Sequence, residues 1–234
     1  MNEQDLQDAL GPRIDPTPAP RPERVTLTGR FVTVAPLAAE HAESLYAASH
    51  GPGCEQLWTY LFNGPFDNLE AFTADVEAKA KAADPLHFVV LDNRDQRPVG
   101  YQSLMRIDPG HRVIEVGGIM YTPLMQASAG STEAQYLFAR YVFDALGYRR
   151  YEWKCNDRNA PSRRAALRLG FSFEGVFRQH MIVKNRSRDT AWFSMLDREW
   201  PARRAAFEGW LGADNFDAQG RQKQRLQDFA ISTP

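Results

Sequence analysis

Two segments in the second half of the chain combine small and polar residues in an order that suits phosphate binding. The first, Gln126-Ala-Ser-Ala-Gly-Ser-Thr-Glu133, follows the glycine pair Gly117-Gly118 and precedes a strongly amphipathic stretch. The second, Asn159-Ala-Pro-Ser162, also joins a strand-like stretch to a helical one. The first turn of a helix presents free backbone amides and the positive end of the helix dipole, and both attract anions. Two such joints on neighbouring strands predict a cleft that holds a phosphorylated cofactor.

Glu115 is the candidate for acid–base chemistry in the same region. It lies with Val113, Ile114 and Val116 in a strand-like stretch that leads toward the glycine pair. Burial in such surroundings raises the pKa of a carboxylate toward working pH, where a general base is most effective. A glutamate that faces outward from the strand is the alternative interpretation, because alternation alone does not say which face of the sheet is buried.

The helix that follows the first segment is the best-defined element of the sequence. Apolar residues over 134–146 recur at helical spacing and form a continuous stripe. We expect this helix to start at Gly130, with Glu133 as a cap partner, and to stop at Gly147. Asn159 is a natural N-cap for the next helix, so both polar segments are expected at helix starts.

The rest of the chain alternates strand-like and helical patterns and shows no internal repeat. Period-two alternation marks the strands, and a period of 3.6 residues marks the helices. The strand–helix–strand unit over residues 112–155 should be parallel with a right-handed crossover, whereas the strands before it should pair antiparallel. We therefore predict an α+β fold. The expected strands are 25–34, 86–91, 99–107, 112–121, 148–155, 171–183 and 190–196, and the expected helices are 37–49, 69–83, 130–146, 159–169 and 200–211, with a polar turn at 184–189.

Composition restricts the class of protein. The 234 residues carry a formal net charge of −1, which supplies no overall attraction for nucleic acid or for an anionic membrane. No apolar run approaches the roughly 18 residues of a membrane span, and the N-terminus is too polar for a signal peptide. Two cysteines, Cys54 and Cys155, suggest neither a disulfide framework nor a zinc site. The five histidines show no ligand spacing, so we expect no metal and a cytoplasmic location.

Three parts are expected along the chain. Residues 1–22 contain five prolines and are typical of a poorly ordered arm. Residues 23–201 should form the main domain, and residues 202–234 a helical tail. The apolar stripe from Trp200 to Leu211 can pack on the domain or on a second subunit, so a monomer and a homodimer both remain open.

Several short motifs, in this order and spacing, resemble those of the GNAT N-acetyltransferases. Pro123-x-x-Gln126 before a small-residue turn looks like the acyl-CoA loop of that family, and so does Asn159-x-x-Ser162 followed by Gly170-Phe171. The segment from Glu174 to Pro201 is similar to the ribosomal-protein alanine acetyltransferase branch. The likeness covers residues 24–201.

The resemblance implies a mixed, largely antiparallel sheet that is splayed around a cleft for acetyl-CoA and flanked by helices. The pantetheine arm would pair with the sheet like an extra strand, and successive amides of the loop would face the pyrophosphate. The usual loop carries two glycines where this chain has Ala129 and Ser131, which we expect to reduce conformational freedom without loss of binding. The residues implied in cofactor binding are Ile119, Met120, Tyr121, Gln126, Ala127, Ser128, Ala129, Gly130, Ser131, Thr132 and Asn159.

The resemblance also implies direct attack of an amine on the thioester, with Glu115 as the general base. Many relatives place a tyrosine, as general acid, at the position of Ala166, so this chain lacks that group. The ribosomal-protein branch uses the serine at the position of Ser162 instead; a first-turn serine satisfied by its own helix is the alternative interpretation. A glutamate used by that branch falls at Met181 here, which argues against an identical catalytic pair.

The predicted activity is N-acetyl transfer from acetyl-CoA to a primary amine, either a protein N-terminus or a small-molecule amine. Trp58, Tyr60, Phe62 and Phe66 lie where the family builds its acceptor wall, although core packing explains such aromatic residues equally well. Two other functions fit the same sequence. One is a CoA-binding sensor or interaction module with little catalysis, and the other is an acyltransferase with a longer donor such as succinyl-CoA.

Overall fold

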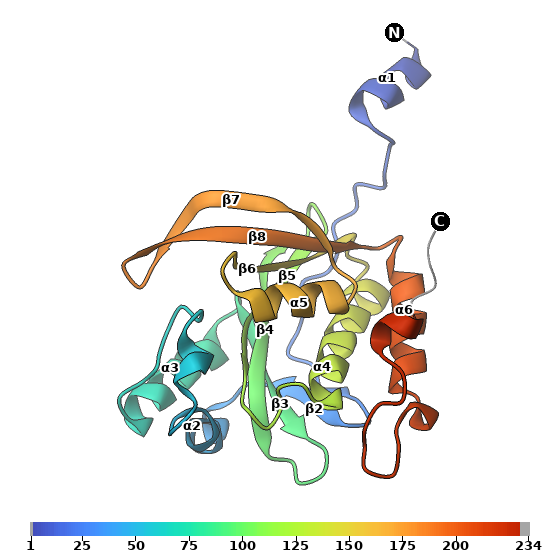
Figure 1. Cartoon of the computed structure of the whole chain (residues 1–234). Coiled ribbons are helices and arrows are strands. Elements are labelled where there is room, and N and C mark those ends of the chain that lie inside the picture. Colours follow the sequence, from blue (N-terminus) through green and yellow to red (C-terminus); the bar gives the residue numbers. More distant parts are fainter. Residues whose placement is uncertain (1, 230–234) are drawn as a thin grey trace.

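A sheet of eight strands forms the centre of the computed structural model, which describes residues 2–229 (Figure 1). The strand order is β1-β2-β3-β4-β5-β6-β8-β7, and every neighbouring pair is antiparallel except β5 and β6, which are parallel. The predicted α+β class and the parallel strand–helix–strand unit are therefore confirmed. The strands are β1 (Leu27–Thr28), β2 (Val32–Pro36), β3 (Leu86–Asp92), β4 (Pro98–Asp108), β5 (Val113–Tyr121), β6 (Arg150–Asn156), β7 (Ser172–Val183) and β8 (Arg186–Leu196).

Helices cover both faces of this sheet (Figure 1). On one face lie α2 (Ala42–Ser49) and α3 (Leu69–Lys81), and on the other lie α4 (Ala129–Arg140), α5 (Ala160–Arg168) and α6 (Trp200–Leu211). All five overlap the helices that the sequence predicts. Shorter helical turns lie at Ala39–His41, Glu55–Trp58, Tyr141–Ala145, Ala213–Asn215 and Leu226–Phe229.

Alternate residues of the central strands contribute to two hydrophobic clusters, one on each face of the sheet. In β3, Phe88 and Val90 face the larger cluster beside α4, whereas Val89 faces the smaller cluster beneath α2 and α3. Phe88 meets Phe138 of α4 edge to face, with ring centroids 5.2 Å apart. Burial on both faces explains why residues 86–91 contain so many apolar side chains in succession.

Strands β5 and β6 pair only along their first halves. The parallel register ends where Val116 lies opposite Trp153, although β5 continues to Tyr121. The pairing of β5 with β4 shifts by one residue at the glycine pair, and Gly118 adopts a φ of +57°, a conformation that favours glycine. This bulge bends β5 away from β6. Within the described chain, the second half of β5 has no strand partner on its β6 side, so the splay that the resemblance implies is confirmed.

The start of α4 differs from the prediction. Its N-cap is Ser128, whose Oγ accepts a hydrogen bond from the Ser131 amide at 3.2 Å, and Gly130 lies within the first turn. Glu133 does not cap the helix. Its carboxylate accepts hydrogen bonds from the backbone amides of residues 30–32, at 2.6–2.9 Å. The contact fixes the start of α4 on the turn between β1 and β2, and these partners are too distant in sequence for a local pattern to reveal them.

The expected poorly ordered arm contains a helix, α1 (Glu3–Leu10), which projects from the body of the molecule (Figure 1). Asn2 caps this helix, because its Oδ1 accepts a hydrogen bond from the Asp5 amide at 2.9 Å. The prolines of the arm begin only after the helix, so they do not interrupt it. Farther along, Ala19 is buried and its amide donates to the Pro109 carbonyl at 3.1 Å. The arm is therefore partly structured and attached to the sheet.

The helix after the main domain packs on its own chain. Trp200, Phe207 and Trp210 of α6 are buried in the larger cluster, so the apolar stripe has its partner within the described chain. The segment that follows α6 turns back, and Phe229 packs against the same cluster. Residues 230–234 of the expected tail lie outside the described residues.

The hairpin of β7 and β8 has a tighter turn than the one predicted over residues 184–189. Only Lys184 and Asn185 form the turn, with φ values of +49° and +59°, and β8 starts at Arg186. Two-residue turns with positive φ at both positions match the twist of the flanking strands. The polar residues after the turn, including Arg188, therefore belong to a strand of the sheet.

Candidate functional site

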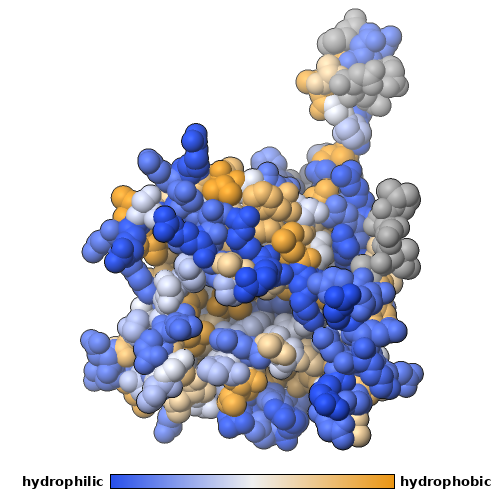
Figure 2. Space-filling model, viewed as in Figure 1, coloured by the Kyte–Doolittle hydropathy of each residue, from blue (hydrophilic) through white to orange (hydrophobic). Residues whose placement is uncertain are grey.

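A cleft of about 1820 Å³ opens where β5 and β6 separate. Figure 2 shows a hollow across the middle of one face of the molecule, with weakly polar residues inside and hydrophilic residues around it. We call the part formed by α4, α5 and residues 210–227 the helix end, and the part formed by residues 53–62 and β8 the loop end. Most predicted site residues line the cleft, namely Ile119, Tyr121, Gln126, Ala127, Ser128, Ala129, Ser131, Thr132, Asn159 and Ser162; the exceptions are Glu115, Met120 and Gly130.

The first turn of α4 presents free amides to the helix end. The amides of Ala127, Ala129 and Gly130 have no hydrogen-bond acceptor within the described chain. Ala127 adopts a φ of +57°, which costs a residue with a side chain about 1–2 kcal/mol. Residues 129–131 are helical. A helical backbone does not require glycine, so Ala129 and Ser131 replace the usual glycines without strain. The strained position is Ala127 instead.

Gly130 serves the packing of α4 rather than the lining of the cleft. It is buried, and a Cβ at this position would lie 2.7 Å from Cγ1 of Val32 in β2. Any side chain there would push the helix away from the sheet. Together with the hydrogen bonds of Glu133, this close approach fixes where the free amides of α4 lie.

Two arginines of α5 add positive charge at the helix end. Arg164 and Arg168 line the cleft, and their spacing of four residues places them on one face of the helix. Arg168 donates a hydrogen bond to Thr132 Oγ1 at 2.9 Å, so its guanidinium lies beside the first turn of α4. Burial lowers the pKa of Arg168, but an arginine remains charged in any protein. Arg163 points elsewhere and pairs with Asp157. Our sequence reasoning missed Arg168, which the spacing from Arg164 could have revealed.

The segment after α6 completes the helix end of the cleft. Trp210, Phe216 and Arg221 line it, and the Arg168 guanidinium lies 5.3 Å from the Trp210 ring centroid. These residues fall in the expected tail, whose composition gives no sign of a role in a site. The tail is therefore part of the wall of the cleft.

The unpaired half of β5 forms the floor between the two ends. Ile119 and Tyr121 line the cleft, whereas the side chain of Met120 is fully buried in the smaller cluster. Side chains alternate between the two faces of a strand, so Met120 points away from the cleft and can contribute only its backbone to it. Tyr121 is held by hydrogen bonds with Gln102 and Gln135. Burial raises the pKa of Tyr121, so its hydroxyl remains protonated.

Asn159 and Ser162 form the start of α5 on the opposite wall. Asn159 is the N-cap, as predicted, and its Oδ1 accepts a hydrogen bond from the Ser162 amide at 3.1 Å. Trp153 Nε1 donates a hydrogen bond to Ser162 Oγ at 3.0 Å. Because an indole N–H only donates, the hydroxyl hydrogen of Ser162 is left for another acceptor. Burial raises the pKa of the neighbouring Cys155 thiol, and the Ser162 hydroxyl lowers it by a smaller amount.

Glu115 lies behind the floor of the cleft rather than in its lining. The residue is 5% exposed, which rules out the alternative of an outward-facing glutamate. Its Oε2 accepts hydrogen bonds from Lys154 Nζ at 2.9 Å and pairs with Arg106 Nε at 3.1 Å. Lys154 lines the cleft, pairs with Glu152 at 2.6 Å and lies 3.8 Å from the Trp192 ring centroid. A single lysine within a strand pattern gives no functional signal, so our sequence reasoning missed it.

One carboxylate oxygen of Glu115 has no protein partner. Both cations bind Oε2, and Oε1 accepts no hydrogen bond from the described residues. A Cβ at Gly117 would lie 3.4 Å from Oε1, and Gly117 lines the cleft. Burial raises the pKa of Glu115 more than Lys154 and Arg106 lower it. The arrangement provides a proton acceptor next to the cleft, with a pKa above that of an exposed glutamate.

The aromatic residues of the loop end are divided between the core and the cleft. Trp58 is buried in the smaller cluster and Phe66 packs against that cluster, whereas Tyr60 and Phe62 are exposed and line the cleft. Core packing therefore accounts for Trp58 and Phe66, whereas an acceptor wall stays a prediction for Tyr60 and Phe62. Tyr60 Oη donates a hydrogen bond to the Arg158 carbonyl at 3.0 Å, which connects the loop to the opposite wall.

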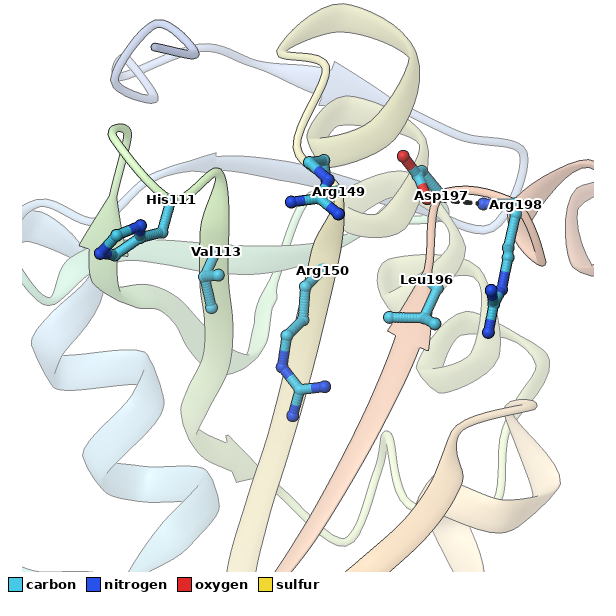
Figure 3. Close-up of a pocket in the computed structure, with 7 residues that line it drawn as sticks. All are labelled: His111, Val113, Arg149, Arg150, Leu196, Asp197 and Arg198. Carbon is cyan, nitrogen blue, oxygen red and sulfur yellow. Dashed lines mark hydrogen bonds between the residues drawn. The ribbon is translucent and has the colours of Figure 1, made fainter. Parts of the chain in front are cut away.

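A smaller cavity of about 290 Å³ lies where β5 and β6 are still paired. Figure 3 shows Arg149 and Arg150 at the start of β6, between His111 and Arg198. Arg150 is already engaged by Glu174, with a hydrogen bond of 2.8 Å. This cavity contains none of the predicted site residues, so we locate the candidate site in the larger cleft.

Three observations on the described residues concern metals, membranes and thiols. Within residues 2–229, no three side chains of metal-binding type lie close enough together to hold an ion. None of the helices over the same residues is long and apolar enough to cross a bilayer. Both cysteines are free, and Cys155 is buried.

Comparison with known proteins finds relatives that share this fold. A family model described as an acetyltransferase (GNAT) domain matches residues 32–172, a range that contains every predicted site residue. A GCN5-related N-acetyltransferase from Brucella melitensis is 52% identical, with a TM-score of 0.90 over 92% of this chain and 97% of that chain. A probable GNAT acetyltransferase from Chromobacterium violaceum is 36% identical, with a TM-score of 0.73 over 82% of this chain and 100% of that chain.

A more distant structure shares the fold alone. It is the microcin C7 self immunity acetyltransferase MccE, solved in complex with acetyl-CoA and AMP. Its identity to this chain is 20%, and the TM-score is 0.63 over 72% of this chain and 93% of that chain. No curated protein sequence matches the chain.

The buried ionic cluster behind the cleft predicts a strong effect on stability. Lys154→Met should lower the free energy of unfolding by about 3–5 kcal/mol, because Glu115 and Glu152 lose their shared cation in a buried position. Chemical denaturation measures this change. As a matched control, Lys81→Met removes an exposed lysine that pairs with Glu77 at 3.8 Å and should change stability by less than about 1 kcal/mol. Equal effects of the two substitutions would contradict the assignment.

Proposed function

The chain belongs to the GNAT family of acyl-CoA-dependent N-acyltransferases, and we propose that it transfers an acetyl group from acetyl-CoA to a primary amine. The observation that carries the proposal is the separation of β5 and β6 beside the free amides of α4. The complex of MccE with acetyl-CoA supports the same donor for this fold. The acceptor is a protein N-terminus or a small-molecule amine.

The residues of the helix end fit a donor that is extended and phosphorylated. The amides of Ala127, Ala129 and Gly130 can bind pyrophosphate oxygens without losing protein hydrogen bonds, and Arg164 and Arg168 add full positive charges. The unpaired edge of β5 can pair with an extended chain as an additional strand. Acetyl-CoA supplies the acetyl group as an activated thioester.

We assign Glu115 as the general base. Its Oε1 would accept a proton from the acceptor ammonium group beside Gly117, directly or through one water molecule. Lys154 and Arg106 bind the other oxygen and hold the carboxylate in this orientation. Because burial raises the pKa of Glu115, it binds a proton more readily than an exposed glutamate would.

We assign Ser162 as the proton donor to the leaving thiolate. Ala166, at the usual tyrosine position, is fully buried in the core and has no hydroxyl to offer. The hydrogen bond from Trp153 fixes Ser162 Oγ and leaves its hydrogen to be donated.

Acetyl-CoA should stabilise the folded protein. A ligand at 100 times its Kd that binds only the folded state adds about 2.7 kcal/mol. The test is a thermal-shift titration with acetyl-CoA, CoA and succinyl-CoA, followed by an assay of thiol release against a panel of primary amines. Absence of stabilisation by all three compounds would overturn the proposal. Stabilisation without thiol release would favour the CoA-binding module instead.

Glu115→Gln should lower kcat/KM by about 100- to 10,000-fold, the usual contribution of a general base, and leave the Kd of acetyl-CoA unchanged. In the wild-type enzyme only the deprotonated carboxylate is active. We therefore expect kcat/KM to fall as pH decreases through the pKa of Glu115, which burial raises, and we expect Glu115→Gln to lack this acidic limb. A pH–rate profile measures both. The exposed Glu43→Gln serves as a control without effect; a wild-type rate for Glu115→Gln would disprove the assignment.

Ser162→Ala should lower kcat by about 100-fold, as expected for loss of a general acid. The Kd of acetyl-CoA should be unchanged, because alanine keeps the backbone amide that Asn159 caps. Steady-state kinetics at saturating donor, together with equilibrium binding, separates the two effects. Ser172→Ala, at an exposed position of β7, is the matched control. A loss of donor affinity with kcat intact would assign Ser162 to binding.

A further inference from the structure

The loop end of the cleft contains a buried arginine that has no hydrogen-bond or ion-pair partner among residues 2–229. Arg188 of β8 is 8% exposed and lines the cleft. Its buried Nε meets no acceptor, and its guanidinium makes no hydrogen bond or ion pair with the described residues. Its Cζ lies 5.0 Å from the ring centroid of Phe62, which belongs to the loop on the opposite side.

Among the described residues, no carboxylate forms an ion pair with Arg188, so its charge is only weakly compensated. The neighbouring buried cation, Lys154, has two carboxylates at 2.9 Å and 2.6 Å. By contrast, the residue opposite Arg188 on β7 is Met181, and the hydroxyl of Thr190 is engaged with His180 Nδ1 at 3.0 Å. An unpaired buried charge costs several kcal/mol, and an arginine cannot avoid the cost by losing its proton. The position of Arg188 is therefore unfavourable unless a ligand supplies an anion.

Arg188 lies on the same side of the sheet as the proposed base. In β8, Trp192 is opposite Lys154, and Arg188, four residues before it, points to the same face. Burial lowers the pKa of Arg188 and the carboxylate of Glu115 raises it, so the two charges share one environment. Arg188 and Lys154, the partner of Glu115, both line the cleft on this side.

We infer that Arg188 binds an anionic group of the acceptor, so that the acceptor is an amine that also carries a carboxylate or a phosphate. The inference rests on the proposed N-acetyl transfer. A guanidinium presents its donors in a planar fork that matches both anions. The contact with Phe62 covers one face of that plane and leaves its edges for hydrogen bonds. A small amino compound with an acidic group and the N-terminus of an acidic peptide both have this chemistry.

The first test uses the protein without any acceptor. Arg188→Met should leave the melting temperature unchanged or raise it, because it removes an uncompensated buried charge and retains an apolar side chain. It should also reduce the stabilisation that inorganic phosphate gives to the wild-type protein. Arg186→Met, at an exposed position of the same strand, should do neither. A fall in melting temperature by several degrees for Arg188→Met, with the phosphate effect intact, would show a structural role and overturn the inference.

The second test compares acceptors that differ only in the anion. The pairs are γ-aminobutyrate with n-butylamine, and peptides that begin Ser-Glu with peptides that begin Ser-Gln, assayed by thiol release from acetyl-CoA. In the wild-type enzyme the anionic member of at least one pair should have a kcat/KM about 10-fold higher or more, which is the scale of one charge-assisted hydrogen bond. Arg188→Met should remove this preference through KM and leave the Kd of acetyl-CoA unchanged.

The outcomes of the second test distinguish a small acceptor from a peptide. They also show whether the inference about Arg188 or the proposed N-acetyl transfer is wrong. A preference confined to the first pair identifies a small acceptor, and one confined to the second identifies an acidic peptide. Equal use of both members of both pairs would overturn the inference and leave N-acetyl transfer intact. Failure of the proposed function would instead be seen as no stabilisation by acetyl-CoA, and the phosphate measurement would still decide whether Arg188 binds an anion.

Discussion

The end of hydrogen bonding between β5 and β6, at Val116 and Trp153, is the constraint on which the rest of the site depends. Buried backbone groups that lose their strand partner must find another one. The bulge at Gly118 redirects β5, and on the β4 side Ser103 Oγ donates to the Gly117 carbonyl at 2.9 Å, so this group is satisfied by the protein itself. The backbone groups on the β6 side of the second half of β5 have no strand partner within the described chain and are left for a ligand. Because α4 starts shortly after β5 ends, its free amides are in line with the same edge.

The two ends of the cleft use charge in different ways. At the helix end, amides of α4 carry a partial positive charge of roughly half a unit, which the exposed Arg164 and the half-buried Arg168 supplement. Behind the floor, Lys154 is shared by Glu115 and Glu152, all of them almost fully buried. Burial still dominates the pKa of Glu115, which is raised despite two adjacent cations. The basicity of this carboxylate is therefore set by its depth in the sheet more than by its partners.

Local features of the site could be predicted from the sequence, and features that depend on distant contacts could not. Asn159 was identifiable as an N-cap because its partner is three residues away. Glu133 looked like a cap residue for the same reason, but its carboxylate binds a turn more than 100 positions away. Lys154 acquires its role only from carboxylates on its own and the adjacent strand, and the strain at Ala127 is a property of the backbone. Arg188 was assigned to a turn, because a polar stretch does not show where pairing of the strands resumes.

The two ends of the cleft, at which we propose that the donor and the acceptor bind, are held by different contacts. The helix end is held by three hydrogen bonds to the Glu133 carboxylate and by the close contact of α4 with β2 at Gly130. At the loop end, residues 53–62 are held by the buried Trp58 and by hydrogen bonds from Tyr60 Oη to the Arg158 carbonyl and from Lys184 Nζ to backbone carbonyls of residues 58 and 64. A substitution in the loop can therefore change the acceptor site without moving the amides of α4. For this reason we expect contacts of the main fold to determine the proposed donor end, and a few side chains such as Arg188 to determine the choice of acceptor.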